Sequence, residues 1–195
     1  NICLMIQNTF AYPSPRFAPV FGEHELHVLS PFGKVRYPII FEWNQYKSAD
    51  NYIIAIDEIG WSFKTAETKV VPGPDEIKLE HGKEYMWELK IMSGGKELDA
   101  ITGFFTVASL NELRELSEIE GRVKSIKPEV DGLILWGSIL EEKEFYLEAI
   151  QQYKKAYDVR IEDGIAYRIA NCYDKLELDE LRDEWNKKIA GIRGD

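Results

Sequence analysis

The side chains best suited to bind a transition metal are three histidines, and two of them lie close together in the chain. His24 and His27 have a short spacing of the kind that zinc sites use. On an extended strand, however, residues three apart point to opposite faces of the sheet. No second pair of histidines or cysteines follows, and His81 is distant in sequence. The pattern therefore predicts polar residues at the start of a strand and no metal site.

Acidic side chains are abundant, and a pair of carboxylates could perform acid–base catalysis. The densest acidic runs alternate with basic residues, which is typical of exposed helix faces. None of the runs lies in the apolar local sequence that favours a general acid. We therefore expect solvated helix surfaces. The acidic runs are Glu141-Glu142, Glu144, Asp179-Glu180 and Asp183-Glu184, beside Lys143, Lys175, Arg182 and Lys187.

Motifs for nucleophilic catalysis or phosphate binding are missing from the sequence. The glycine-rich segment 93–96 predicts a hairpin turn, because no helical pattern follows it. Neither Cys3 nor Cys172 has a nearby base, and Cys172 falls on a helical core stripe, where a thiol behaves as a small hydrophobe. We therefore predict no catalytic residues, no cofactor and no enzymatic activity.

The composition excludes several partners. The 195 residues carry a net charge of −10, and acidic residues outnumber basic ones on both sides of Ser109. An acidic surface repels polyanions, so nucleic acid and anionic membrane surfaces are not expected partners. No window reaches the roughly 20 apolar residues that a membrane span needs. The 45% hydrophobic and 30% charged content is that of a folded protein.

The hydrophobic pattern changes near Ser109, and this change divides the chain in two. Before it, short β-branched and aromatic runs are separated by Gly and Pro, which is typical of an antiparallel β-sandwich. After it, apolar residues recur every three to four residues, which predicts helices. We therefore predict an extended segment at 1–25, an all-β domain at 26–108 and an all-α domain at 109–195. The predicted strands are 27–29, 39–43, 52–56, 61–64, 69–71, 76–79, 85–91 and 102–107.

Several aromatic positions of the β part form a recognisable set. They are Phe41-x-Trp43, the alternating run from Tyr52 to Ile56, Tyr85-x-Trp87 after Gly82, and Phe104-x-Thr106. Over residues 26–108 this set resembles fibronectin type III and immunoglobulin-like modules. The resemblance implies that Trp43 fills the core between two sheets and that Tyr85 pins a corner between strands. It implies nothing about a ligand, because unrelated functions use this fold.

A linker helix is predicted to open the all-α part. Ser109 and Glu112 have the spacing of a capping box, and an apolar stripe continues toward Pro128. The sequence therefore predicts a linker helix within 109–126. Four further helices are predicted at about 129–142, 145–159, 163–176 and 179–192.

The last four helices carry a repeated pattern of large, small and aromatic residues. The first unit has Leu133, Trp136-Gly137, Leu140, Ala149, Tyr153 and Ala156, and the second has Ala166, Ile169-Ala170, Tyr173, Leu181 and Trp185. This pattern resembles tetratricopeptide repeats, with helix pairs at 129–160 and 163–192. The second unit departs at Leu181, where the family has a small residue, and this suits a terminal unit. Because two units are fewer than the roughly three of a stable array, we expect the linker helix to supply the missing layer.

The resemblance to tetratricopeptide repeats implies protein–protein interaction. In that family, partner peptides lie on the concave face made by the first helix of each pair. Asn171 stands where the family often clamps a peptide backbone, whereas Ser138 at the matching place is a weaker donor. We therefore expect a non-catalytic scaffold with a protein or peptide partner. The identity of the partner and the oligomeric state of the protein stay open. Carried over by position, the face holds Ile134, Ser138, Glu141, Tyr167, Asn171, Asp174 and Lys175.

Two alternatives from other functional classes stay open. Trp61 and Phe63 share one face of a predicted edge strand, and such aromatic side chains either stack on sugar rings or close a sandwich core. A carbohydrate-binding sandwich with a helical spacer is therefore the second hypothesis. An enzyme whose site is assembled from distant residues is the third.

The first residues of the chain bear on its location. The apolar run 2–6, followed by small residues up to Ala11, fits the remnant of a signal peptide and equally fits an edge strand. Together with the sandwich layout, it leads us to expect a periplasmic, envelope-associated or secreted protein of a prokaryote. A cytoplasmic location is the alternative.

Overall fold

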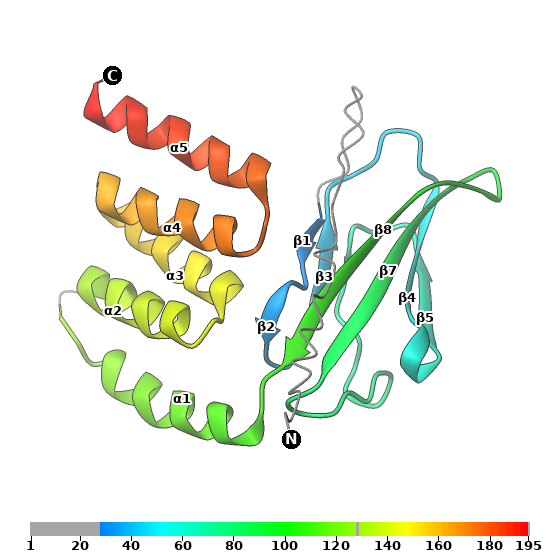
Figure 1. Cartoon of the computed structure of the whole chain (residues 1–195), viewed down its shortest axis with the longest axis horizontal. Helices are drawn as coiled ribbons and strands as arrows, with labels where there is room; N and C mark the ends of the chain where they lie inside the picture. Colours follow the sequence, from blue (N-terminus) through cyan, green and yellow to red (C-terminus); the bar gives the residue numbers. More distant parts are fainter. Residues whose placement is uncertain (1–27, 128, 195) are drawn as a thin grey trace, which may run out of the picture.

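The structure is a computed structural model that describes residues 28–127 and 129–194. The predicted extended segment 1–25 lies outside this range, as do Cys3, His24 and His27. Residues 28–108, the β region, form two sheets, and residues 109–194, the helical region, form five helices. The two regions lie side by side, with the helices stacked in chain order along one side of the β region (Figure 1). The change from strands to helices near Ser109 agrees with the change in hydrophobic pattern.

The β region consists of a three-stranded and a five-stranded sheet. The smaller sheet has the order β1 (Val28–Ser30), β3 (Phe41–Trp43), β6 (Lys69–Val70). The larger sheet has the order β2 (Gly33–Val35), β8 (Lys96–Val107), β7 (Glu84–Ser93), β4 (Asn51–Ile56), β5 (Trp61–Thr65). The β2–β8 pair is parallel, which departs from the predicted antiparallel arrangement, and the other pairs are antiparallel. A short 3₁₀ turn, η1 (Asp57–Ile59), joins β4 to β5.

Aromatic side chains from both sheets meet in one core. Phe41 of the smaller sheet packs edge-on against Trp87 of the larger one, with ring centroids 5.4 Å apart, and Trp43 packs against Tyr52 at 5.2 Å. Alternate residues of β4 and β7 are buried because successive side chains of a strand point to opposite faces. The predicted core position of Trp43 is therefore confirmed. The Tyr85 hydroxyl accepts a hydrogen bond from the Glu80 N–H at 2.8 Å, a contact of the kind that the predicted corner role requires.

The bounds of several strands differ from the prediction, most of all at β8, which begins at Lys96 where 102 was predicted. Two further differences concern whether a strand is present. The strand predicted at 76–79 is wrong. Ile77 and Leu79 are buried, but they lie in a turn and loop closed by the Glu76 N–H, which donates to the Gly73 carbonyl. Their alternation reflects a segment that covers the core without joining a sheet. Conversely, β2 was missed, because three residues between two prolines carry almost no strand pattern.

The helices agree closely with their predicted ranges. They are α1 (Leu110–Val123), α2 (Glu129–Glu142), α3 (Tyr146–Val159), α4 (Asp163–Lys175) and α5 (Asp179–Arg193). The capping box that opens α1 is present. The Glu112 N–H donates to Ser109 Oγ and the Ser109 N–H donates to the Glu112 carboxylate. Leu116 of α1 is fully buried in the helical core, so the linker helix does add a layer against α2, as predicted.

The helical region is held together by contacts between consecutive helices. The closest approach is at Gly137 of α2, where an added Cβ would lie 2.6 Å from the ring of Tyr153 on α3. Tyr153 is fully buried, as are Ala149 and Ala156 on the same helix. Only glycine lets the ring of Tyr153 lie flat on α2. The small-residue positions of the first predicted unit are therefore where two helices meet.

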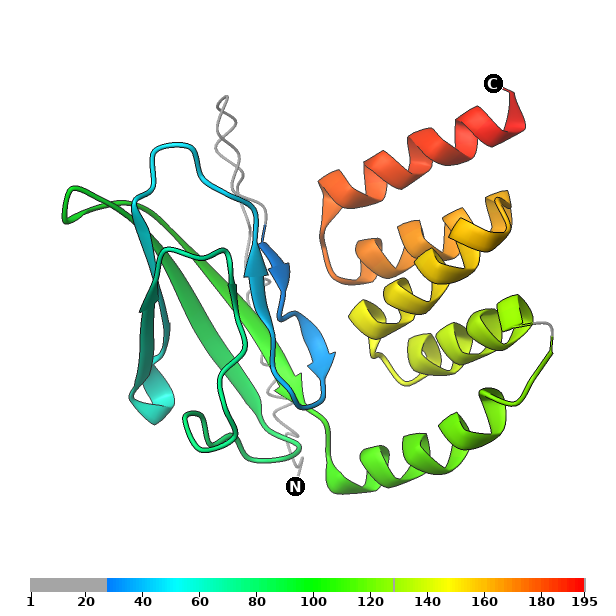
Figure 2. The ribbon, with the colours of Figure 1, turned by 180° about the vertical axis from the view of Figure 1, so that it is seen from behind.

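The helical region folds back onto β2, and we call this contact the junction. Lys34 donates hydrogen bonds to Glu112 of α1 at 2.7 Å and to Glu144, in the α2–α3 turn, at 3.2 Å. Arg36, one residue beyond β2, forms a two-point ion pair with Glu148 of α3, with nitrogen–oxygen distances of 2.6–3.0 Å. Viewed from behind, β2 is the strand that faces the helices (Figure 2).

Apolar contacts complete the junction. Leu147 of α3, together with Leu176 and Leu178 of the α4–α5 turn, packs against the core of the β region. Gly33 makes this possible, because a Cβ there would lie 3.0 Å from Leu176 and because its φ of +63° favours glycine. The α2–α3 and α4–α5 turns therefore lie on the same edge of the helical region, against β2.

Candidate binding surfaces

The residues predicted to form a binding face lie on α2 and α4. Asn171 and Arg168 of α4 donate hydrogen bonds to Glu141 of α2 and so link the two helices. We call the predicted set the α2/α4 face. It consists of Ile134, Ser138, Glu141, Tyr167, Asn171, Asp174 and Lys175. The hydrogen bonds, ion pairs and core contacts of the junction involve none of these residues within 28–127 and 129–194. The β region therefore docks on the turn edge and not on this face.

Glu141 is the centre of a polar cluster on the face. Its carboxylate accepts hydrogen bonds from Asn171 Nδ2 at 3.0 Å, from Arg168 at 3.2 Å and from the Tyr153 hydroxyl at 2.6 Å. The Tyr153 hydroxyl also lies 3.3 Å from Ser138 Oγ. Four side chains from three helices are therefore ordered around one carboxylate. Charge-assisted bonds of this kind are stronger than neutral ones and fix side-chain geometry.

The buried member of this cluster is Tyr153, whose phenol bonds to Glu141. Burial raises the pKa of Tyr153, and its hydrogen bond to the Glu141 carboxylate raises it further. The phenol therefore stays protonated and acts as a hydrogen-bond donor. Burial and the nearby Glu141 also raise the pKa of the Cys172 thiol, to about 12. This buried cysteine is therefore an inert core residue, as predicted.

The remaining predicted residues of the face are not drawn into the cluster. Tyr167 projects from α4 with 61% of its surface exposed. Asp174 forms an ion pair with Arg182 of α5 at 3.1 Å. The exposed Lys175 forms no ion pair or hydrogen bond through its side chain among the residues that the structure describes. Tyr167 and Lys175 therefore remain accessible to a partner.

Exposed apolar side chains border one end of the face. Leu135 of α2 is 43% exposed, and Val159 and Ile161 around the α3–α4 turn are 71% and 68% exposed. Arg160 of this turn pairs with Asp131 at the start of α2, so the α3–α4 turn lies beside the N-terminal end of α2. The surface therefore combines an apolar end with a polar end at Glu141, Asn171 and Lys175.

Sequence reasoning missed two features of this surface. It did not include Arg168, although an arginine one helical turn from Asn171 has the spacing needed to reach the same acceptor. It also read Tyr153 as a filler of the helix gap, without its hydroxyl. The size of an aromatic side chain at a repeat position is visible in the pattern, whereas the partner of its hydroxyl depends on how two helices are set against each other.

The aromatic pair of the alternative hypothesis lies on β5, an edge strand of the larger sheet. Trp61 is half-buried and stacks on the buried Phe41, with centroids 5.5 Å apart. Phe63 is 40% exposed, and its ring is nearly parallel to that of Trp61 at 6.5 Å. The predicted common face of the two rings is confirmed. Trp61 both closes the core and reaches the surface.

The described residues also show what surrounds the remaining polar candidates. His81 Nδ1 donates to the Ala108 carbonyl at 2.8 Å, which ties the loop before β7 to the start of α1. Within 28–127 and 129–194, no three His, Cys, Asp or Glu side chains are grouped so that they could hold a metal ion. Each helix in this part of the chain is too short or too polar to cross a bilayer.

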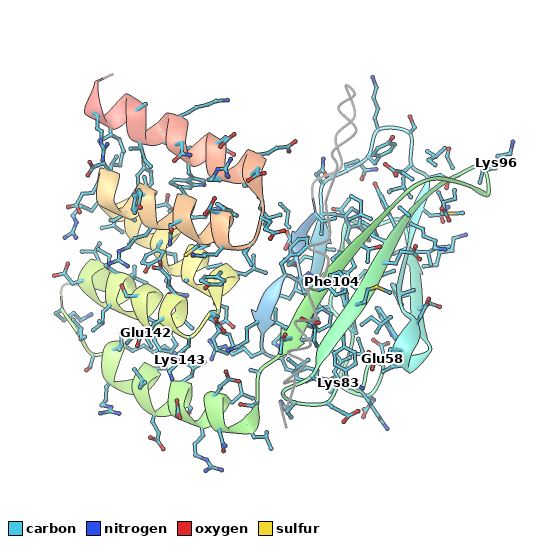
Figure 3. The ribbon with its side chains drawn as sticks, in the orientation of Figure 1. Glu58, Lys83, Lys96, Phe104, Glu142 and Lys143 are labelled. Carbon is cyan, nitrogen blue, oxygen red and sulfur yellow. The ribbon has the colours of Figure 1, made fainter. Side chains whose placement is uncertain are left out.

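Charged side chains at the ends of the elements add local ties without forming a cleft. Lys143 at the end of α2 pairs with Glu115 of α1 at 2.6 Å, and Lys83 pairs with Glu58 of η1 at 2.7 Å. Lys96 marks the tip of the β7–β8 hairpin, far from the helices (Figure 3). Such exposed pairs contribute little to stability.

Comparison with known proteins gives no relative: no protein-family model matches the chain, and no curated protein matches it significantly.

Proposed function

We propose that this protein is a non-catalytic scaffold whose α2/α4 face binds a segment of a partner protein. In this proposal the β region is a fibronectin type III or immunoglobulin-like sandwich, and α2–α5 are two tetratricopeptide-like helix pairs capped by α1. The core tryptophan Trp43, the tyrosine corner at Tyr85 and the close contact of Gly137 with Tyr153 support these assignments. An exported or envelope-associated location belongs to the same proposal.

The observation that carries the proposal is the orientation of the helical region. The junction uses the α2–α3 and α4–α5 turns, and none of its contacts in 28–127 and 129–194 uses a residue of the α2/α4 face, so that Tyr167 and Lys175 stay exposed to solvent. The Glu141 cluster holds Asn171 in place before any partner arrives. Pre-ordered polar groups beside an exposed aromatic ring are the features that make a binding surface efficient.

The test is selection of peptides from a displayed random library on the full chain, followed by affinity measurement on two face variants. Because Asn171 and Lys175 offer hydrogen-bond donors on the face, Asn171→Ala and Lys175→Glu should each weaken binding roughly tenfold, about 1.4 kcal/mol. Lys187→Glu is the matched control, since Lys187 is an exposed lysine of α5 outside the face.

The control variant should bind as the wild-type chain does. Peptides that bind both face variants with unchanged affinity would remove the assignment of the face. Failure to select any peptide would remove the proposed function. Circular dichroism of each variant separates lost binding from lost folding.

A further inference from the structure

A second surface with the features of a ligand site lies on β5, apart from the helical region. Phe41 stacks on the Trp61 ring, and Phe63 lies two residues along the strand with its ring nearly parallel to that of Trp61. In the register of the sheet, Trp61 lies opposite Ile56 and Phe63 opposite Ile54. The aromatic core of the β region therefore extends to the protein surface at this edge.

Beside Trp61 there is a hollow of about 310 Å³. One wall comes from Ile59, Gly60 and Trp61, and the other comes from Asp75, Glu76 and Lys78 of the loop after β6. The volume is at the lower end of the range of small-ligand pockets. A hollow of this size accommodates one ring of a small ligand against the tryptophan.

Glu76 orders the polar wall, whereas the polar groups of Asp75 and Lys78 stay available to a ligand. Glu76 Oε2 accepts the Gly73 N–H at 2.7 Å, which holds the loop in its turn. The side chains of Asp75 and Lys78 make no hydrogen bond or ion pair with any other residue in 28–127 and 129–194. Donor and acceptor groups therefore face solvent within reach of an aromatic ring.

We propose that this hollow binds a neutral saccharide, with a pyranose ring stacked on Trp61. A sugar ring has an apolar C–H face that fits an aromatic ring, while its hydroxyls can bond to Asp75, Glu76 and Lys78. A wholly apolar ligand would leave these polar groups without partners at a cost. A polyanion would be repelled by the two carboxylates and by the net charge of −10. Phe63 extends the platform for a neighbouring sugar unit.

The site is independent of the proposed peptide-binding face. β2 and β5 are the two opposite edges of the five-stranded sheet. The helical region lies on the β2 side of the β region, and β5 lies on its far side (Figure 1). Trp61 of β5 lines the hollow. Both surfaces can therefore be occupied at the same time, so that the protein would link a polysaccharide to a protein partner.

The experiment measures binding of the full chain to an array of neutral oligosaccharides that includes cellohexaose, chitohexaose, maltohexaose and xylohexaose, with oligogalacturonate as the anionic probe. Titration calorimetry then gives the affinity of the best binder. Asp75→Ala and Lys78→Ala should each weaken binding about tenfold, because each removes a charge-assisted hydrogen bond. Both residues are exposed, so these variants test the site without the unfolding risk of Trp61→Ala.

Lys64→Ala is the matched control for Lys78→Ala, because Lys64 is an exposed lysine on the opposite face of β5. It should leave the affinity unchanged, as should Asn171→Ala on the other surface. Absence of binding to every neutral oligosaccharide would overturn the proposal. Binding that tolerates both loop variants, or binding of oligogalacturonate alone, would overturn it as well. None of these results would count against peptide binding by the α2/α4 face, because the two surfaces are separate.

Discussion

The β region and the helical region each have a core of their own, but they close these cores in different ways. In the β region, strands far apart in sequence meet, as when β2 pairs with β8. In the helical region, each helix packs mainly on the one before and the one after it. A sheet core of the first kind is complete in itself, whereas a linear stack has open ends and edges. The junction at β2 covers one such edge, and the α2/α4 face remains open.

In each core a glycine lies against a buried aromatic ring. The same glycine-to-alanine substitution can therefore be compared in the two regions. Gly103 of β8 lies under Trp87, where a Cβ would meet the ring nitrogen at 2.6 Å. Gly137 of α2 lies under Tyr153 at the same distance. Both rings are almost completely buried, so neither can move away without disturbing its surroundings. A single methyl group therefore probes the rigidity of each region.

Adding that methyl group should give the largest effect. Gly103→Ala is expected to lower the free energy of unfolding by about 3 kcal/mol, because Trp87 would have to shift and lose its hydrogen bond to the Pro31 carbonyl. Gly137→Ala should cost about 2 kcal/mol, because alanine recovers roughly 1 kcal/mol of helix propensity. Urea unfolding measured by circular dichroism gives both values.

Gly121→Ala is the control for these two variants. Gly121 lies within α1, and a Cβ there meets nothing within 4 Å, so the change should stabilise the chain by about 0.5–1 kcal/mol. If Gly137→Ala were stabilising to the same degree, Tyr153 would not be rigidly seated on α2. The close helix contact that supports the repeat assignment would then be lost.

The junction should give the next largest effect. Arg36→Ala removes the two-point ion pair with Glu148 and the contact with Glu120 at 3.5 Å. We expect a loss on the order of 1–2 kcal/mol, since these side chains are partly buried and the Glu148 carboxylate would lose its ion-pair partner, whereas Glu120 keeps its ion pair with Lys124. The two regions should then unfold at different urea concentrations, as measured by far-UV circular dichroism and by hydrogen exchange of each region.

Lys69→Ala is the control for the junction, because its ion pair with Glu42 lies within the β region and is exposed. It should leave a single transition with little change in midpoint. Separate transitions already present in the wild-type chain would contradict the view that the junction couples the two regions.

Glu112 adds a pH dependence to the junction. Burial alone would raise the pKa of Glu112, but hydrogen bonds from Lys34 and Ser109 outweigh it and lower the pKa to about 2. A carboxylate with a lowered pKa in the folded state stabilises the chain above its unfolded pKa, near 4.5, and loses this effect as the pH falls toward 2. After allowance for solvent screening, the contribution is on the order of 1 kcal/mol.

The measurement compares Glu112→Gln with the wild-type chain in urea at pH 7, 4 and 2. The variant should be less stable at pH 7, and the difference should begin to shrink by pH 4 and be largely lost near pH 2. A constant difference across this range would show that the capping geometry, and not the charge, is what Glu112 supplies.

The sequence predicted the helices better than the strands, for a physical reason. A helix is defined by contacts between neighbours, so that the stripe around Leu116 and the capping box at Ser109 suffice to place α1. A strand depends on a distant partner. β2 has only three residues and pairs with β8, whereas the alternating Ile77 and Leu79 have no ladder to join. The local sequence pattern indicates that such residues are buried, but it does not indicate which strand they pair with.

The candidate surfaces followed the same rule. The binding face on α2 and α4 came from the resemblance to helical repeats and stays a prediction, whereas the common face of Trp61 and Phe63 followed from the two-residue period of a strand. The convergence of Arg168 and Asn171 on Glu141, and the loop that completes the hollow at Trp61, depend on segments brought together by folding. No local pattern contains that information.

The smallest expected effect separates the backbone from the junction. Glu144 and Glu177, in the α2–α3 and α4–α5 turns, both have positive φ values, 68° and 57°, which glycine adopts without strain. Glu177→Gly should therefore raise the free energy of unfolding by about 0.5 kcal/mol, since the relief of strain exceeds the added freedom of the unfolded chain. Glu144→Gly relieves the same strain but also removes the ion pair with Lys34, so its net effect should be close to zero.

Thermal unfolding at low and high salt tests the difference, because screening weakens the ion pair and leaves the backbone term unchanged. If both variants were stabilised equally at low salt, Glu144 would act through its backbone alone, and Lys34 would depend on Glu112 to hold the two regions together.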